Sequence, residues 1–167
     1  MNNELVTIEE STLDFDSIKQ EAYYPKELDD YLSKCDVWIV PEEIHRDGYD
    51  ILFPEHTKDV KRFLFCKGMK IDVPCKDDDF HEIELHDASI LLGSFLLTSI
   101  VLPLFINLIS SYIYDKVLSK DKDNEVKLNL HIKSQKGKVV KIKYKGPASK
   151  MNSTLKEVEK IANDDKQ

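Results

Sequence analysis

The chain has 167 residues, of which 41% are hydrophobic and 33% are charged, and its formal net charge is −7 at pH 7. This size and this mixture suit one packed domain and exclude an intrinsically disordered chain. Because the net charge is negative, we do not expect nucleic acid among the partners of the protein.

The charge is unevenly distributed along the chain. Residues 1–114 hold 10 Lys and Arg against 23 Asp and Glu, whereas residues 115–167 hold 14 against 8. The front part is therefore acidic and the back part basic, which leaves open a local contact between the basic part and an anionic partner.

The cysteines and the N-terminal residues indicate the compartment. Cys35, Cys66 and Cys75 are an odd number and show no Cys-x-x-Cys spacing, as is typical of free thiols in a reducing compartment. The start MNNELVTIEE is acidic and polar, unlike a secretory signal. We therefore expect a cytoplasmic protein in which the first dozen residues, which have no clear period, and the tail 164–167 are frayed.

The acidic part, residues 1–87, predicts a mixed α/β unit. Pro25 suits the first position of a helix, because the backbone N–H that proline lacks would have no hydrogen-bond partner at that position. Short β-branched and aromatic runs that end at Pro or Gly predict strands. The expected elements are a helix over 26–34, strands over 37–40 and 49–53, a helix that begins at Pro54 and ends at Gly68, and strands over 69–73 and 80–85.

The strongest feature of the sequence is a run of 27 residues without a charge, from Ala88 to Tyr114. At about 1.5 Å per residue, such a run can cross the apolar core of a bilayer. We predict one long apolar helix over 88–114, with small and polar side chains along one side. That side comprises Ser89, Gly93, Ser99, Pro103, Asn107, Ser110, Ser111 and Tyr114, of which Gly93, Pro103, Asn107 and Ser111 are our candidate contact residues.

Two environments fit this helix. In lipid it would be a single span, and the lysines that follow it would place the C-terminal part in the cytoplasm, but the acidic front part would then have to cross the membrane. In a protein core it would connect the strand over 80–85 to a strand over 125–133 as a β-α-β crossover. Since the helix is long for so small a domain, a partner chain would then cover its remaining apolar surface.

The back part predicts a β-hairpin followed by a helix. Apolar residues alternate with lysines over 126–133 and 140–145, and Gly137 suits the turn between these strands. One face of the hairpin is then apolar and the other basic. The lysines of the basic face are candidate contacts with acidic lipid headgroups, nucleic acid or an acidic protein surface: Lys127, Lys133, Lys141, Lys143 and Lys145. Thr154 and Glu157 predict a capping box for a closing helix.

We find no catalytic, cofactor-binding or metal-binding motif. His81, Glu82 and His86 lie in the segment HEIELH, but the two histidines are five residues apart, whereas the zinc-protease helix requires four. Cys66 lies among apolar residues, where a small buried thiol is expected rather than a nucleophile. The five glycines are scattered singly, which excludes dinucleotide-binding and P-loop patterns.

From about Ile90 onward the layout of the chain resembles the effector-associated constant component, a small domain of bacterial conflict and defence systems. The resemblance rests on an apolar helix running into LISSYIYDKV, the hairpin VKLNLHIKSQKGKVVKIKYKG and the helix STLKEVEKIA. It covers less than half of the chain. It implies recruitment beside variable effectors rather than chemistry.

Together these observations predict an α+β fold with a small mixed sheet, in which residues 1–87 and 88–163 pack as one domain. We expect a non-enzymatic adaptor without a cofactor that contacts a protein partner or forms a homo-oligomer. The alternatives are a membrane-associated or membrane-permeabilising effector that uses residues 88–114 and a hydrolase that uses His81, Glu82 and His86.

Overall fold

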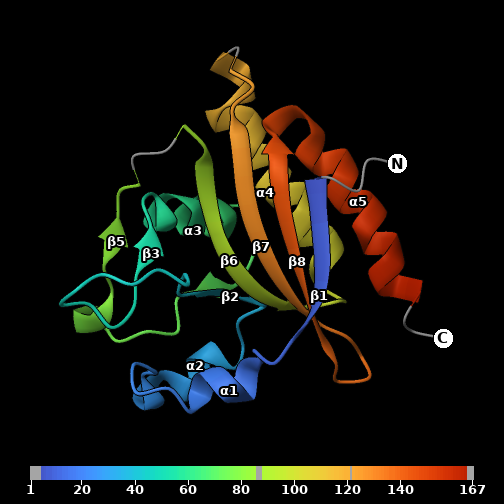
Figure 1. Ribbon diagram of the computed structural model, residues 1–167. Helices are drawn as coiled ribbons and strands as arrows, with labels where there is room; N and C mark the ends of the chain where they lie inside the picture. Colours follow the sequence, from blue (N-terminus) through green and yellow to red (C-terminus); the bar gives the residue numbers. More distant parts are fainter. Residues whose placement is uncertain (1–4, 86–87, 121, 165–167) are drawn as a thin grey trace.

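One six-stranded mixed sheet organises the protein (Figure 1). The structure, a computed structural model, describes residues 5–85, 88–120 and 122–164, with side chains up to residue 160. The strand order is β1-β8-β7-β6-β2-β4, with β6 parallel to β7, β2 parallel to β4 and the other neighbours antiparallel. The bounds are β1 Val6–Ser11, β2 Val37–Val40, β4 Ile71–Asp72, β6 Ile90–Thr98, β7 Glu125–Lys133 and β8 Val139–Pro147. The predicted α+β class is confirmed.

The uncharged run forms two elements rather than one, so the prediction of a single helix over 88–114 is wrong. Residues Ile90–Thr98 form β6, and the helix α4 spans only Leu102–Lys116. β6 lies between β7 and β2 and is buried on both faces, which makes its sequence continuously apolar instead of alternating. Within the described residues, we find no helix with both the length and the apolarity needed to cross a membrane.

A β-α-β crossover is present, but its first strand is not the predicted one. β6, α4 and β7 form the crossover, because β6 and β7 are parallel neighbours joined through α4. The expected strand over 80–85 shortens to β5 (Glu82–Ile83). Of the expected strand over 49–53 only Phe53 belongs to a strand, β3 (Phe53–Pro54), so the prediction of a helix that begins at Pro54 is wrong. These two pair in a separate two-stranded sheet.

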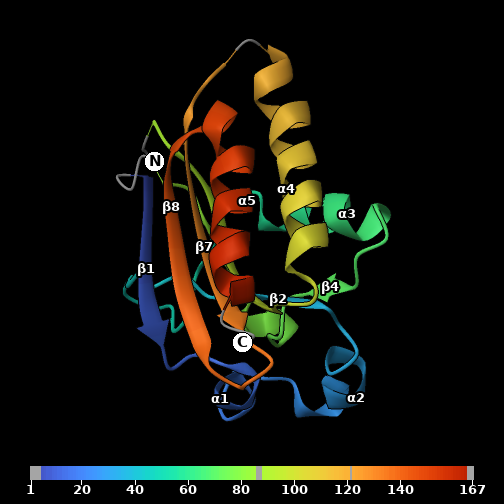
Figure 2. The same ribbon diagram turned by 90° about the vertical axis from the view of Figure 1, so that its right-hand side faces the viewer.

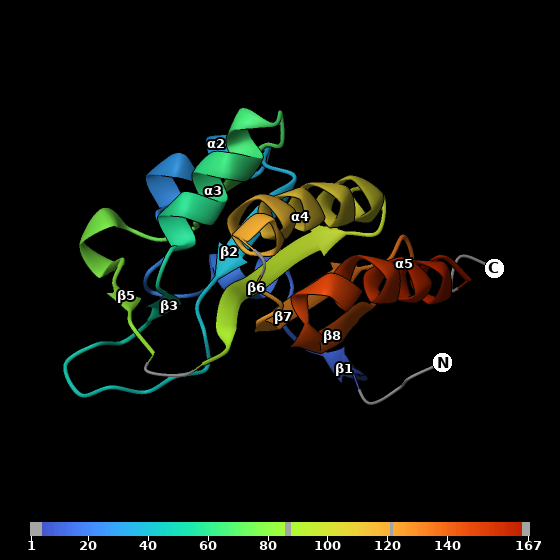
Figure 3. The same cartoon turned by 90° about the horizontal axis from the view of Figure 1, so that it is seen from above.

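Helices α4 and α5 (Ala148–Asp164) lie together on one face of the sheet, as Figures 2 and 3 show. α3 (Thr57–Cys66) lies beside α4. Fully buried residues of the helices and the strands form the main core there, among them Phe95, Phe105, Ile109, Leu130 and Leu155.

Part of the opposite face is covered by α1 (Phe15–Lys19), a 3-10 turn (Lys26–Leu28) and α2 (Asp29–Leu32). Trp38 of β2 is the centre of this second core, with Ile18 and Tyr24 around it. Its indole N–H donates to the carbonyl of Leu32 at 2.9 Å. Two further 3-10 turns span Asp77–Asp79 and Leu118–Lys120.

The ends of the chain differ from the sequence predictions. Residues Val6–Ser11, expected to be frayed, form the edge strand β1 on β8. α5 begins at Ala148, because Asp123 accepts hydrogen bonds from the amide and the hydroxyl of Ser149. The capping box at Thr154 is therefore wrong, since Thr154 lies inside the helix. Of the predicted tail 164–167, only Asp164 is described, as the last residue of α5.

Candidate interaction surfaces

The five candidate lysines lie on one face of the sheet, opposite α4 and α5. In β7 and β8 they alternate with buried core residues such as Leu130 and Ile142, as the sequence predicted. Lys127 is paired in register with Lys145, and Lys141 with His131. We refer to Lys127, Lys133, Lys141, Lys143 and Lys145 as the lysine face.

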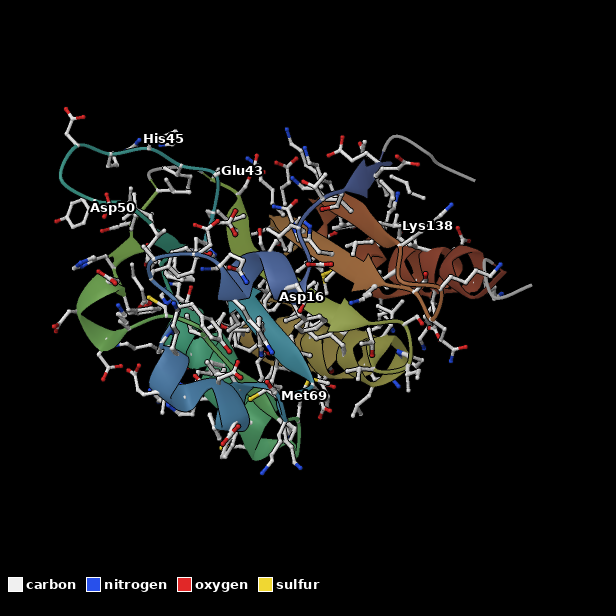
Figure 4. The ribbon with its side chains drawn as sticks, turned by 90° about the horizontal axis from the view of Figure 1, so that it is seen from below. Asp16, Glu43, His45, Asp50, Met69 and Lys138 are labelled. Carbon is white, nitrogen blue, oxygen red and sulfur yellow. The ribbon has the colours of Figure 1, made fainter. Side chains whose placement is uncertain are left out.

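Carboxylates from the acidic part of the chain neutralise some of this face. Glu9 of β1 pairs with Lys143 at 3.3 Å, and Glu43, in the loop after β2, pairs with Lys141 at 3.4 Å. Figure 4 shows Glu43 at the base of that loop. Solvent screens these exposed pairs, so each contributes little to stability, but both lower the positive potential of the lysine face.

Between the lysines lies a buried polar network that sequence analysis assigned no role. The Ser94 hydroxyl donates to Glu42 Oε1 at 2.8 Å and accepts from the Asn129 amide at 3.2 Å. His131, which is 5% exposed, has its Nδ1 3.1 Å from the Ser11 hydroxyl. The network therefore ties β1, β6, β7 and the loop after β2 to one another.

The pKa values of two groups in this network, His131 and Glu42, differ from their ordinary values. Burial, aided by the nearby charge of Lys141, lowers the pKa of His131 to about 4. Burial also raises the pKa of Glu42, although the hydrogen bond from Ser94 opposes the shift. Sequence analysis missed this network, and the signal that could have found it is the break that Asn129 and His131 make in the lysine alternation of β7.

The small-residue side predicted for the long helix is divided between two elements. Gly93 lies in β6, where the register with β7 shifts by one residue and the backbone φ is +137°. It is buried and therefore does not belong to an exposed contact surface. Pro103, Asn107 and Ser111 lie on α4 and are exposed.

The outer side of α4 exposes a row of uncharged side chains. Beside Pro103, Asn107 and Ser111 it exposes two large side chains, Leu104 at 49% and Tyr114 at 66%, and Ile100, in the turn just before α4, is 67% exposed. We refer to Ile100, Pro103, Leu104, Asn107, Ser111 and Tyr114 as the α4 stripe. Uncharged side chains exposed in a row along a helix are typical of a surface that another molecule covers.

A groove runs along the C-terminal half of the α4 stripe. It has a volume of about 570 Å³, and its walls come from α3, α4 and α5. The lining residues include Phe63, Lys67, Ser110 and Asn152. The Ser110 hydroxyl is buried there and finds no hydrogen-bond partner among the described residues.

The arrangement does not support the candidate hydrolase. The ring of His81 packs against that of Tyr49 at 4.8 Å, and Glu82 lies in β5, whereas His86 is outside the described residues. In the part of the chain that the structure describes, no three His, Cys, Asp or Glu side chains could hold a metal ion together. Cys66 is exposed at the end of α3, so its predicted burial is wrong.

Comparisons with protein-family models, with curated proteins and with solved structures found no match. The resemblance to the effector-associated constant component therefore stays a prediction.

Proposed function

We propose that the protein is a non-enzymatic adaptor that binds another protein chain through the α4 stripe. The observation that carries this proposal is the exposure of Leu104 and Tyr114 on one uncharged side of α4, together with that of Ile100 in the turn just before it. In a chain with 33% charged residues, so large an uncharged surface resembles the centre of a protein interface, which is depleted of charge and enriched in aromatic residues.

The lysine face is a weaker candidate for the contact with another protein chain. Glu9 and Glu43 already pair with two of its lysines. A contact there would be electrostatic and sensitive to salt. The α4 stripe would bind by apolar burial instead.

The resemblance to the effector-associated constant component supports the same class of function, because it implies recruitment beside an effector. A role in a bacterial defence or conflict system is part of this proposal and rests on that resemblance alone.

The experiment is photo-crosslinking in cells. A photoreactive phenylalanine analogue replaces Leu104 in the full chain, and the matched control carries it at Lys156, an exposed position of α5. We expect a discrete adduct from position 104 only, and we expect Ser111→Arg to abolish it. The proposal is wrong if position 104 gives no adduct or gives the same adducts as position 156.

A further inference from the structure

We infer that the chain bound by the α4 stripe is a second copy of this protein, with the two α4 helices packed antiparallel. This inference rests on the proposed function, since it uses the same surface. It adds the identity of the partner and the orientation of the contact.

The spacing of the exposed side chains favours a helix as the occupant. Within α4 they repeat at intervals of three, four and three residues in the order Leu104, Asn107, Ser111 and Tyr114, and Ile100 lies in the turn just before the helix. This is the heptad spacing by which one helix packs against another, with the knobs of each helix in the holes of its partner. The buried side of the same helix already packs in the main core through Phe105 and Ile109, and Tyr112 packs against α3, so the exposed repeat is a second packing side.

The positions of the charges fix the orientation. The first charged residues of α4 are Asp115 and Lys116, both at its C-terminal end, whereas its N-terminal end has none. A parallel pair would bring Asp115 next to its own copy and align the two helix dipoles. An antiparallel pair separates these residues to opposite ends of the contact.

Antiparallel packing also matches the sizes of the side chains. With the two-fold axis near Ile109, Leu104 of each copy meets Tyr114 of the other, and Asn107 meets Ser111. The centre of the contact then contains small side chains that can hydrogen-bond, and the two flanks contain large apolar ones. A polar residue at one position of a helix seam is a known means of fixing its register.

The dimensions predict a weak dimer. α4 has 15 residues, so it is about 22 Å long, and one of its sides is a strip of about 22 by 10 Å. A standard interface buries roughly 800 Å² per partner, so the second copy must also cover the groove beside Phe63 and Asn152. We therefore expect a dissociation constant of roughly 1–100 µM.

Such a dimer would present two equal surfaces to other molecules. The lysine face lies on the opposite side of the sheet from α4 in each copy, so pairing through α4 leaves both lysine faces exposed and directed apart.

The test is sedimentation velocity of the full chain from about 1 to about 500 µM, with two charged variants. Asn107→Glu and Ser111→Lys are expected to weaken self-association about tenfold or more, because each buries an unpaired charge. Lys156→Glu on α5 is the matched control and is expected to leave it unchanged. Circular dichroism checks that every variant is folded.

Mixing the two charged variants tests the orientation. In the antiparallel pair, Glu at position 107 of one copy meets Lys at position 111 of the other, so the mixture should associate within about threefold of the wild type. In a parallel pair those two positions do not meet. A wild type that stays monomeric throughout, or a mixture that associates no better than its components, overturns this inference.

Sedimentation of the wild type and crosslinking from position 104 together distinguish a failure of this inference from a failure of the proposed function. If the wild type is monomeric but position 104 still crosslinks to a different protein, the second copy is the wrong occupant and the adaptor proposal stands. If position 104 crosslinks to nothing, the adaptor proposal fails as well.

Discussion

At the scale of single residues, His131 combines nearly complete burial with a strongly lowered pKa. It is nearly fully buried in a sheet face that is otherwise polar, beside Lys141 and Lys143 and with Glu9 and Glu43 nearby. The lysines oppose its protonation and the glutamates favour it, but burial is the largest cause and lowers the pKa of His131 to about 4. The imidazole is therefore neutral in the folded state above about pH 4.

This gives a pH dependence of stability. Between about pH 6.5 and pH 4 the unfolded chain binds a proton at His131 that the folded chain does not, so stability falls as the pH falls through this window. From pH 6.5 to pH 5 the loss is about 2 kcal/mol. Urea denaturation of the wild type and of His131→Gln should show that the variant loses less stability over this range, whereas His45→Gln, in an exposed loop, should follow the wild type. Parallel curves for wild type and His131→Gln would contradict the assignment.

Gly93 gives a second prediction at this scale. Its φ of +137° lies in the region that side chains rarely adopt, and an added Cβ would lie 3.4 Å from the Phe95 ring. We expect Gly93→Ala to destabilise the protein by about 1–3 kcal/mol. Ser153→Ala, on the exposed side of α5, should stay within about 0.5 kcal/mol. A variant Gly93→Ala as stable as the wild type by thermal melting would show that the backbone there is not strained.

At the scale of elements, α4 has one side in the core and one side in contact with solvent. Ile109 is fully buried and Leu104 is half exposed, although both belong to the same uncharged run. Ile109→Ala should therefore cost about 2–5 kcal/mol in the free energy of unfolding. Leu104→Ala, at dilutions where the chain is monomeric, should cost about 0.5 kcal/mol or less. Equal losses in urea denaturation would mean that the stripe is packed against something within the chain.

The elements that sequence reasoning predicted well are those with a clear period. The hairpin of β7 and β8 alternates strictly, and its predicted turn is present, with Gly137 at a φ of +90°. The strand at 37–40 is also confirmed, as is the helix that ends before Gly68, although this helix begins at Thr57 and not at Pro54. Each of these elements has one packing environment, and the spacing of its apolar residues predicts that environment directly.

The central error concerned residues 88–114, where the absence of charge hid a change of element. A strand buried on both faces and a helix buried on one are both rich in Leu, Ile and Phe, so hydropathy alone does not separate them. Pro103 was the available signal, because proline is favoured in the first turn of a helix and marks where α4 begins. The strand β1 was missed for another reason, since an edge strand with four exposed residues carries no apolar period.

At the scale of the whole molecule, the acidic and basic parts of the chain meet within one sheet. β1 and the loop after β2 bring Glu9 and Glu43 to the lysines of β8, so part of the charge asymmetry of the sequence is compensated inside the fold. Sequence alone identified Pro103, Asn107, Ser111 and the lysines as candidates. It could not foresee these carboxylates or the exposure of Leu104, because both depend on contacts between distant segments.

The measurement that most directly tests the role of the α4 stripe is the salt dependence of self-association. Sedimentation velocity at about 50 mM and about 500 mM NaCl separates an apolar contact from an electrostatic one, because salt screens exposed charges. If the uncharged stripe makes the contact, the dissociation constant should change by less than about twofold and should rise at least about tenfold in Ser111→Lys. A dissociation constant that rises steeply with salt and does not change in Ser111→Lys would assign the contact to the lysine face and contradict the role proposed for α4.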